Sequence, residues 1–123
     1  MLHASNIGTL LFDLLTNGED SNHENRFNIS LLSKRLKRAT EWLADYLKKK
    51  EYSFGYFGAS TGAAAAIEAA CKTNVKIKAI VPRGGRIDLA RDYLHSLKAP
   101  AVLIVGEKDE DSAIVLYKKL VNA

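Results

Sequence analysis

A serine framed by glycines at a predicted strand-to-helix junction constrains the fold of this chain more than any other feature. Gly58-Ala59-Ser60-Thr61-Gly62 has G-x-S-x-G spacing and lies between an aromatic run at 52–57 and an alanine-rich run at 63–70. Residue propensities predict a strand for the first run and a helix for the second. A sharp turn between them would raise the Ser60 hydroxyl above the sheet, beside the free N–H groups of the helix start. The pattern predicts a nucleophile elbow; the competing interpretation is that Ser60 only caps the helix.

Segments with strand character and segments with helix character alternate four times along the chain. Hydrophobic patterning and turn residues predict strands at 7–12, 52–57, 77–81 and 101–105. They predict helices at 31–49, capped by Ser30, at 61–72, at 88–97, capped by Asp88, and at 112–121, with a long polar loop at 16–28. This alternation predicts an α/β fold with a parallel sheet of about four strands and right-handed crossovers.

Size and composition indicate one domain, residues 1–123, with no second core. The chain has 123 residues, of which 47% are hydrophobic and 26% charged, and it contains no apolar run long enough for a membrane span. No leader pattern is present, so we expect a cytoplasmic protein that does not bind membranes. Cys71 is the only cysteine, which excludes an internal disulfide and a cysteine-built metal cluster. We expect no metal and no cofactor.

The net charge of +4 raises the question of nucleic-acid binding, and its distribution argues against it. Much of the positive charge falls at 34–38 and 48–50, on the polar side of a segment whose leucines recur at helical spacing. Neither zinc-finger spacing, a helix-turn-helix pattern nor a strand-borne aromatic motif accompanies it. We therefore expect no nucleic-acid partner.

Several polar residues fall where predicted strands end, and in parallel sheets that edge carries the site. They are Asp13, Ser60, Arg83 with Gly84 and Gly85, and Asp109. Arg83 is a candidate for binding a substrate carboxylate or phosphate, as is Arg86; a solvated turn is the alternative. Asp88 is a second candidate acid, which helix capping also explains. Asp13 fits a structural hydrogen-bonding role.

Four phrases in order along the chain resemble the α/β-hydrolase superfamily, in particular its dienelactone-hydrolase-like branch. They are TLLFDLLT (9–16), FGASTGAAAA (57–66), RGGRIDLA (83–90) and VLIVGEKD (102–109). The resemblance implies that Ser60 is the nucleophile, that the N–H of Thr61 is an oxyanion donor and that Asp109 is the acid. Dienelactone hydrolases proper use cysteine, so the serine indicates an esterase-like relative that acts on a small-molecule ester or related acyl bond.

Two parts of that machinery have no counterpart in the sequence. The family order is Ser, acid, His, yet no histidine follows Asp109; His3 and His95 are poorly placed, and only His23 in the polar loop falls at the expected edge. The second oxyanion donor, from a loop after an earlier strand, is also missing. We therefore expect an incomplete α/β-hydrolase fold, nearly inactive alone, and the alternative is a noncatalytic interaction or phosphate-binding module.

The incomplete fold also has a structural consequence. With right-handed crossovers, a four-stranded remnant would carry all its helices on one face and leave the other face bare. We predict that the isolated chain forms a homodimer or aggregates. The sequence leaves open whether a complementing chain supplies the missing parts.

Overall fold

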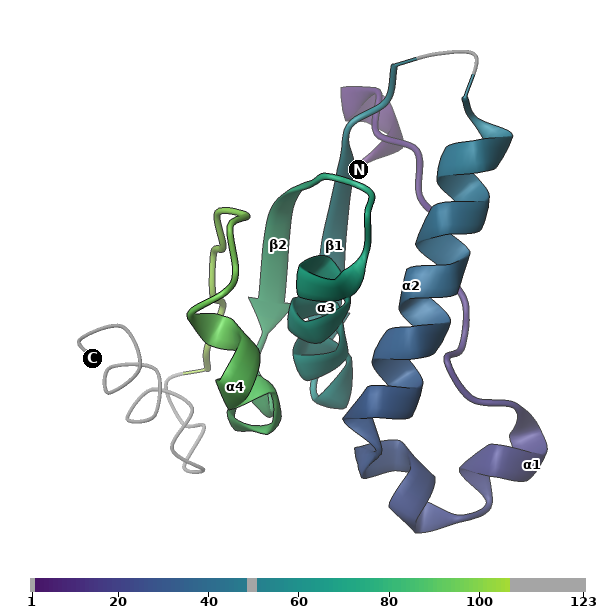
Figure 1. Ribbon diagram of the computed structural model, residues 1–123, viewed down its shortest axis with the longest axis vertical. Helices are drawn as coiled ribbons and strands as arrows, with labels where there is room; N and C mark the ends of the chain where they lie inside the picture. Colours follow the sequence, from purple (N-terminus) through teal and green to yellow (C-terminus); the bar gives the residue numbers. More distant parts are fainter. Residues whose placement is uncertain (1, 49–50, 107–123) are drawn as a thin grey trace.

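The centre of the molecule is a small parallel sheet with a crossover helix. The computed structural model describes residues 2–48 and 51–106. In Figure 1, β1 (Phe54–Ala59) and β2 (Ile77–Arg83) run side by side, joined through α3 (Thr61–Lys72). A later segment continues the sheet beyond β2 through two parallel bridges, Ile80 to Ala101 and Arg83 to Ile104. The predicted α/β class with a parallel sheet and alternating helices is confirmed.

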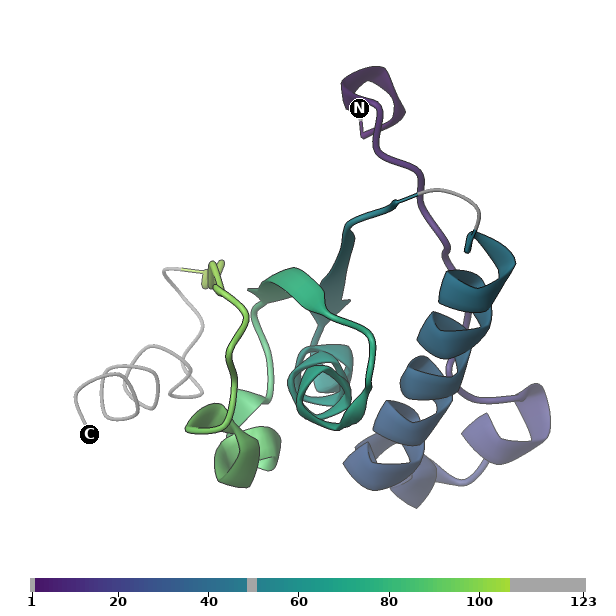
Figure 2. The same ribbon diagram turned by 45° about the horizontal axis from the view of Figure 1, so that its top comes forward.

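Two of the four predicted strands are not formed as strands. Residues 7–12 are extended but unpaired and exposed, and they run alongside α2 rather than in the sheet (Figures 1 and 2). A strand needs a neighbour for its backbone groups, and β1 pairs only with β2 among the described residues. The predicted strand at 101–105 is reduced to its two bridges. The expectation of about four strands was therefore wrong for the described chain.

The helices follow the predicted pattern with shifted ends. α2 (Ile29–Tyr46) starts earlier than predicted because Asn28, and not Ser30, is its cap: Asn28 Oδ1 accepts the Leu31 N–H at 3.2 Å. The predicted helix at 88–97 is a 3₁₀ turn, Ile87–Ala90, followed by the short α4 (Arg91–Leu94). The polar loop contains α1 (Asn17–Asp20) and a 3₁₀ turn, His23–Phe27. The predicted helix at 112–121 lies outside the described residues.

The core lies on one side of the sheet. α3 is buried between the sheet and α2. Five of its alanines and Ile67 are at most 2% exposed: Ala63, Ala64, Ala65, Ala66 and Ala69. Small side chains allow this close packing. Figure 2 shows α2, α3 and α4 on the same side of β1 and β2. In the described part of the chain no helix covers the other face, where Phe57, Val102 and Ile104 are exposed.

Candidate functional site

Ser60 occupies the sharp turn between β1 and α3. It has φ 54° and ψ −126°, a left-handed conformation that is costly for a residue with a Cβ. Its side chain makes no capping hydrogen bond to α3, and the residue is exposed. Ser60 therefore holds the N-cap position of α3 without capping the helix through its side chain. Strain at an exposed polar residue, where a strand ends and a helix begins, is typical of a functional turn.

Only the first of the two motif glycines is required by packing. A Cβ on Gly58 would lie 2.7 Å from the carbonyl carbon of Gly62, because the start of α3 folds back over the end of β1. A Cβ on Gly62 would meet nothing within 4 Å. The tight turn around Ser60 thus depends on the absence of a side chain at Gly58.

The turn after β2 packs against the backbone of Ser60, a contact that the sequence analysis did not predict. Gly85 has φ 93°, and a Cβ there would lie 2.6 Å from the Cα of Ser60. The Arg86 N–H also donates to the Ser60 carbonyl oxygen at 3.4 Å, as the Ala63 N–H does at 3.1 Å. Two adjacent glycines after a predicted strand were the signal for close backbone approach. The glycine pair therefore holds the backbone of the Ser60 turn.

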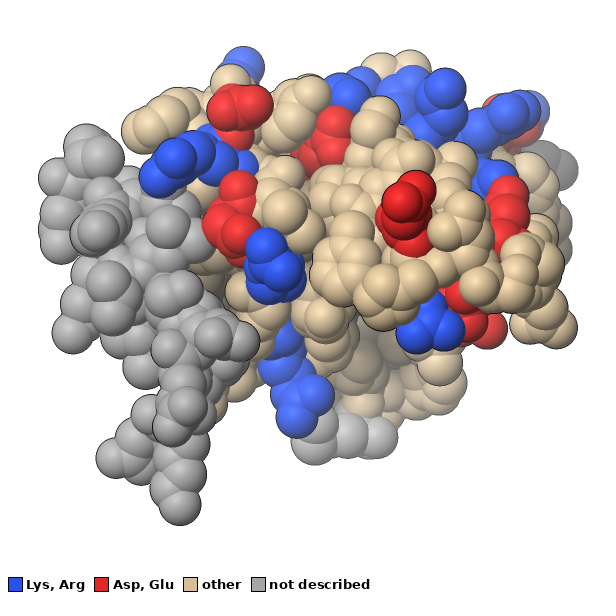
Figure 3. Space-filling view, turned by 90° about the horizontal axis from the view of Figure 1, so that it is seen from below, with Lys and Arg blue, Asp and Glu red and all other residues tan. Residues whose placement is uncertain are grey.

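The start of α3 offers hydrogen-bond donors beside the Ser60 side chain. Thr61 is the first residue of this 12-residue helix, and helix geometry leaves its N–H and that of Gly62 without an acceptor inside the helix. The positive end of the helix dipole adds to their attraction for an anion. Figure 3 shows the edge at which β1 and β2 end, where acidic and basic side chains are interspersed among uncharged ones. The local donors, rather than a field of one sign, would thus favour an oxyanion here.

The candidate acids and cations of the site have different surroundings. Asp88 accepts from Arg86 Nε at 3.0 Å and from Arg86 Nη2 at 2.9 Å, and this pairing lowers the pKa of the Asp88 carboxyl. Asp88 therefore acts as the partner of Arg86. Arg83 is exposed at the last position of β2, and Asp13 is exposed in the segment before α1. Asp109 lies outside the described residues.

None of the three histidines has a described contact with Ser60. His3 bonds Thr9 Oγ1 at 3.2 Å in a 3₁₀ turn at the edge opposite the strand ends (Figure 1). His95 is exposed directly after α4. His23 begins the 3₁₀ turn at the same edge as the ends of β1 and β2, where its ring meets Phe27 edge-on with centroids 5.3 Å apart. His23 is thus the histidine at the candidate edge.

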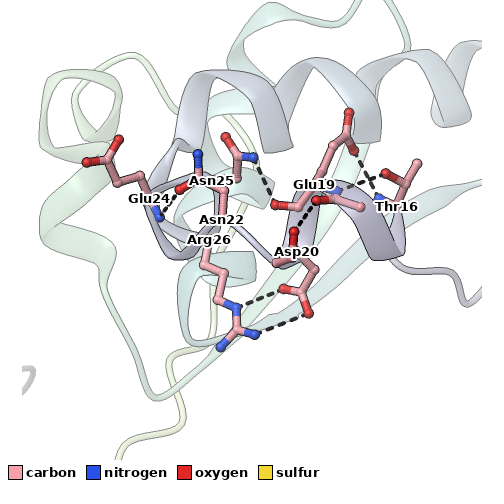
Figure 4. Close-up of polar contacts among 9 residues, drawn as sticks. Thr16, Glu19, Asp20, Asn22, Glu24, Asn25 and Arg26 are labelled. Atoms are coloured by element: carbon pink, nitrogen blue, oxygen red, sulfur yellow. Dashed lines mark hydrogen bonds and ion pairs between the residues drawn. The ribbon is translucent and has the colours of Figure 1, made fainter.

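A dense polar network fixes the segment that carries His23. Thr16 and Glu19 cap α1 reciprocally, Asn25 Nδ2 donates to the Glu19 carbonyl at 2.8 Å, and Arg26 pairs with Asp20 at 2.8 Å (Figure 4). Arg35 on α2 then binds Glu19 at 2.7 Å. The segment is folded and tied to α2, although its composition predicted a plain loop.

Other features lie away from Ser60 or are not seen in the described residues. A cavity of about 440 Å³ is lined by Leu47, Tyr52, Phe54 and Lys78, among others, at the opposite end of β1 from Ser60. Within residues 2–48 and 51–106, no cluster of three or more potential ligands is arranged to hold a metal ion. In the same ranges, no helix has the length and apolarity that a membrane crossing requires.

Comparison with known proteins gives one structural and two sequence relatives. The chain matches the crystal structure of a dienelactone hydrolase from Anabaena variabilis with a TM-score of 0.79 and 42% identity, over 89% of this chain and 52% of that one. This match confirms the predicted resemblance to the dienelactone-hydrolase-like branch of the α/β-hydrolases over the part covered. The chain spans about half the length of that solved relative.

The sequence relatives carry a different name. Two Mycobacterium tuberculosis proteins, from strains CDC 1551 / Oshkosh and ATCC 25618 / H37Rv, are each named "putative phosphoribosyl transferase". Each is 50% identical over 110 residues, which is 89% of this chain and 25% of the relative. The chain thus spans a quarter of these curated relatives. No protein-family model matches it.

Proposed function

We propose, for a chain that shares the dienelactone-hydrolase-like fold over its matched part, that Ser60 is the nucleophile of a serine hydrolase acting on an ester or related acyl bond. The observation that carries the proposal is the strained, exposed Ser60 turn at φ 54°, held between Gly58 and Gly85. Such strain persists only where surrounding structure enforces it, and it clusters at active sites.

In the proposed mechanism, the Ser60 hydroxyl attacks the acyl carbonyl carbon while a base accepts its proton. The carbonyl oxygen becomes an oxyanion, which the Thr61 N–H at the start of α3 would stabilise. Collapse of the tetrahedral intermediate expels the alcohol, which takes the proton back from the base, and leaves an acyl-serine. Water then releases the acid by the same steps. Arg83, exposed at the end of β2, would bind a carboxylate on the substrate.

The proposed mechanism needs a histidine base that reaches the Ser60 hydroxyl. His23 lies at the right edge, but its ring contacts Phe27 and no contact with Ser60 is described. Asp109 is proposed as the acid from the motif resemblance. Losing one oxyanion donor alone costs about 10²–10³ in rate, and a missing base costs more. We therefore propose that residues 1–123 alone are nearly inactive and that the histidine comes from outside these residues.

The alternative is a noncatalytic or phosphate-binding role. The name of the two M. tuberculosis relatives favours it, because a phosphoribosyl transferase handles phosphate groups, but the match covers only a quarter of their length. A phosphate would bind the free N–H groups at the start of α3. Inorganic phosphate or pyrophosphate would then raise the melting temperature, since binding to the native state stabilises it. No rise at millimolar ligand would exclude phosphate binding.

Covalent labelling of Ser60 tests the hydrolase proposal. The chain is treated with a fluorophosphonate and its intact mass is measured, with and without added imidazole as a replacement base. We expect slow labelling that imidazole accelerates and that Ser60→Ala abolishes. Ser96→Ala, which removes a hydroxyl from an exposed turn, is the matched control and should label normally. Absent labelling even with imidazole, or labelling that survives in Ser60→Ala, would contradict the proposal.

A further inference from the structure

The outer side of α2 carries a ridge of four long, exposed side chains at intervals of four residues. The α2 ridge consists of Lys34, Arg38, Trp42 and Tyr46. It faces away from the buried side of the helix, which includes Ile29, Leu32 and Thr40. Trp42 is 60% exposed and Tyr46 73% exposed. Large exposed aromatic side chains on a helix are typical of binding surfaces, where Trp, Tyr and Arg are enriched.

The aromatic half of the α2 ridge is ordered and has an open ring face. The Trp42 and Tyr46 rings stack with centroids 5.4 Å apart and an interplanar angle of 15°. Tyr46 therefore covers one face of the Trp42 indole and leaves the other face available. The cation–π contact found among the described residues joins Lys72 to Tyr93, so the open face of Trp42 has no cation from this part of the chain.

The two basic side chains of the α2 ridge form no ion pair in the described part of the chain. Neighbouring side chains on α2 form ion pairs, Lys37 with Glu41 at 3.3 Å and Lys48 with Asp45 at 3.8 Å. In residues 2–48 and 51–106, neither Lys34 nor Arg38 belongs to an ion pair. The α2 ridge thus presents two cations outside any described ion pair next to an exposed π-face. Because cations bind the faces of aromatic rings, the basic half of one ridge could bind the aromatic half of another.

The order of these side chains makes the α2 ridge complementary to itself. Arg38 and Trp42 lie at equal distances on either side of position 40 (40 − 38 = 42 − 40), and Lys34 and Tyr46 do the same (40 − 34 = 46 − 40). A two-fold axis at that level would bring Arg38 onto the partner's Trp42 and Lys34 onto the partner's Tyr46. We propose that the α2 ridge binds the α2 ridge of a second copy of this chain, antiparallel, through these reciprocal cation–π contacts.

Helix geometry is compatible with this pairing. Ridges formed by residues four apart pack into one another at a crossing angle near −50°. Each step of four residues rises about 6 Å, which brings each cation level with a ring of the other copy. Such a contact is isologous, as in most homodimers. Four side chains from each copy are far fewer than the roughly 20–30 residues a side of a standard interface, so we expect dimerisation at about 100 µM rather than at nanomolar concentration.

A second copy fits the α2 ridge better than the other candidate partners. An acidic protein or a nucleic acid would satisfy Lys34 and Arg38 but gives no reason for their symmetric placement against the two rings. The bare sheet face around Phe57 is also exposed, yet nothing there specifies an occupant. Self-pairing accounts for both halves of the α2 ridge at once.

The single tryptophan makes this proposal directly measurable. Between about 1 and 500 µM chain, sedimentation velocity should show the mass rising from 13.5 kDa towards twice that value. The emission of Trp42 should shift to shorter wavelength over the same range because pairing removes its indole from water. A mass that stays at 13.5 kDa throughout would overturn the proposal. The proposal would also be overturned if the emission of Trp42 did not change with chain concentration but did change when an oligodeoxythymidine was added.

Matched variants identify the surface. Arg38→Glu should weaken dimerisation at least tenfold, and Trp42→Ala should weaken it similarly in sedimentation. Arg91→Glu makes the same charge change at an exposed position on α4 and should leave dimerisation unchanged. Far-UV circular dichroism verifies that each variant is folded. Dimerisation that survives Arg38→Glu but disappears in Phe57→Lys would overturn the proposal and assign the contact to the sheet face.

Discussion

At the residue scale, the two motif glycines have unequal roles. A methyl group at Gly58 would press on the backbone of Gly62, whereas one at Gly62 has open space. We expect Gly58→Ala to lower the free energy of unfolding by about 1–3 kcal/mol, as overpacking does. Gly62→Ala should change it by less than about 1 kcal/mol, in the stabilising direction, because alanine favours the helix. Urea unfolding of the pair measures both, and equal losses would contradict the packing argument.

Gly85 should be as intolerant as Gly58, although it lies outside the motif. Alanine there would have to adopt φ 93° and would lie 2.6 Å from the Cα of Ser60. We expect Gly85→Ala to cost about 2 kcal/mol or more and to slow fluorophosphonate labelling of Ser60. Gly18→Ala is the control, since its methyl group would meet nothing. Unchanged stability and labelling in Gly85→Ala would show that the turn yields without moving Ser60.

Sequence predicts the chemistry of single residues better than their mutual support. The G-x-S-x-G spacing located Ser60 at a strand-to-helix turn because each flanking segment has a strong local preference. Contact between Gly85 and Ser60 joins residues 25 apart in the chain (85 − 60), and no local preference encodes it. His23 shows the same limit: its loop could be placed at the correct edge, but not its ring against Phe27.

At the element scale, one ion pair fastens the segment before α2. Arg35 Nη2 donates to Glu19 Oε1 at 2.7 Å and Arg35 Nη1 donates to the Leu14 carbonyl oxygen at 3.2 Å. The hydrogen bond from Arg35, followed by the backbone hydrogen bond from Thr16, lowers the pKa of Glu19 to about 2. The folded state thus favours the ionised carboxylate more than the unfolded state does.

The stability contributed by Glu19 should therefore depend on pH. A lowered pKa gives stability that is present above the unfolded pKa of about 4.5 and is lost as pH falls through about 2. We expect the unfolding free-energy difference between wild type and Glu19→Gln to shrink across this window in urea titrations. The free-energy difference itself should be modest because Glu19 and Arg35 are both partly exposed. Glu24→Gln, in the same segment, is the control; a flat difference for Glu19→Gln would contradict the role of the pair.

Elements with strong local signals were predicted well, and those that depend on a partner were not. Helix α3 runs over the predicted 61–72 because alanine has the highest intrinsic helix propensity and the run is rich in it. Residues 7–12 have equal strand character, yet remain unpaired because a strand forms only against another strand. The start of α2 was misplaced by the choice between Asn28 and Ser30, two residues with similar capping preference.

At the scale of the whole molecule, the one-sided sheet is the dominant feature. Right-handed crossovers place α3 and α4 on the same face, as the sequence analysis predicted, and α2 lies there too (Figure 2). Alternation along β1 buries Tyr56 and leaves Phe57 67% exposed on the other face. Parallel sheets are normally covered on both faces, so the described fold leaves apolar area of the sheet exposed to water.

Dye binding measures this uncovered face. We expect the chain to enhance the fluorescence of 8-anilinonaphthalene-1-sulfonate under native conditions, because that dye binds exposed apolar surface. Phe57→Ser should reduce the enhancement roughly twofold, since Phe57 is the largest exposed side chain of the face. Phe27→Ser changes a 45% exposed phenylalanine outside the sheet and should have little effect. Equal reductions in the two variants would mean that the dye does not report on the sheet. A native chain that binds no dye, at concentrations where sedimentation shows a monomer, would mean that the face is covered in solution.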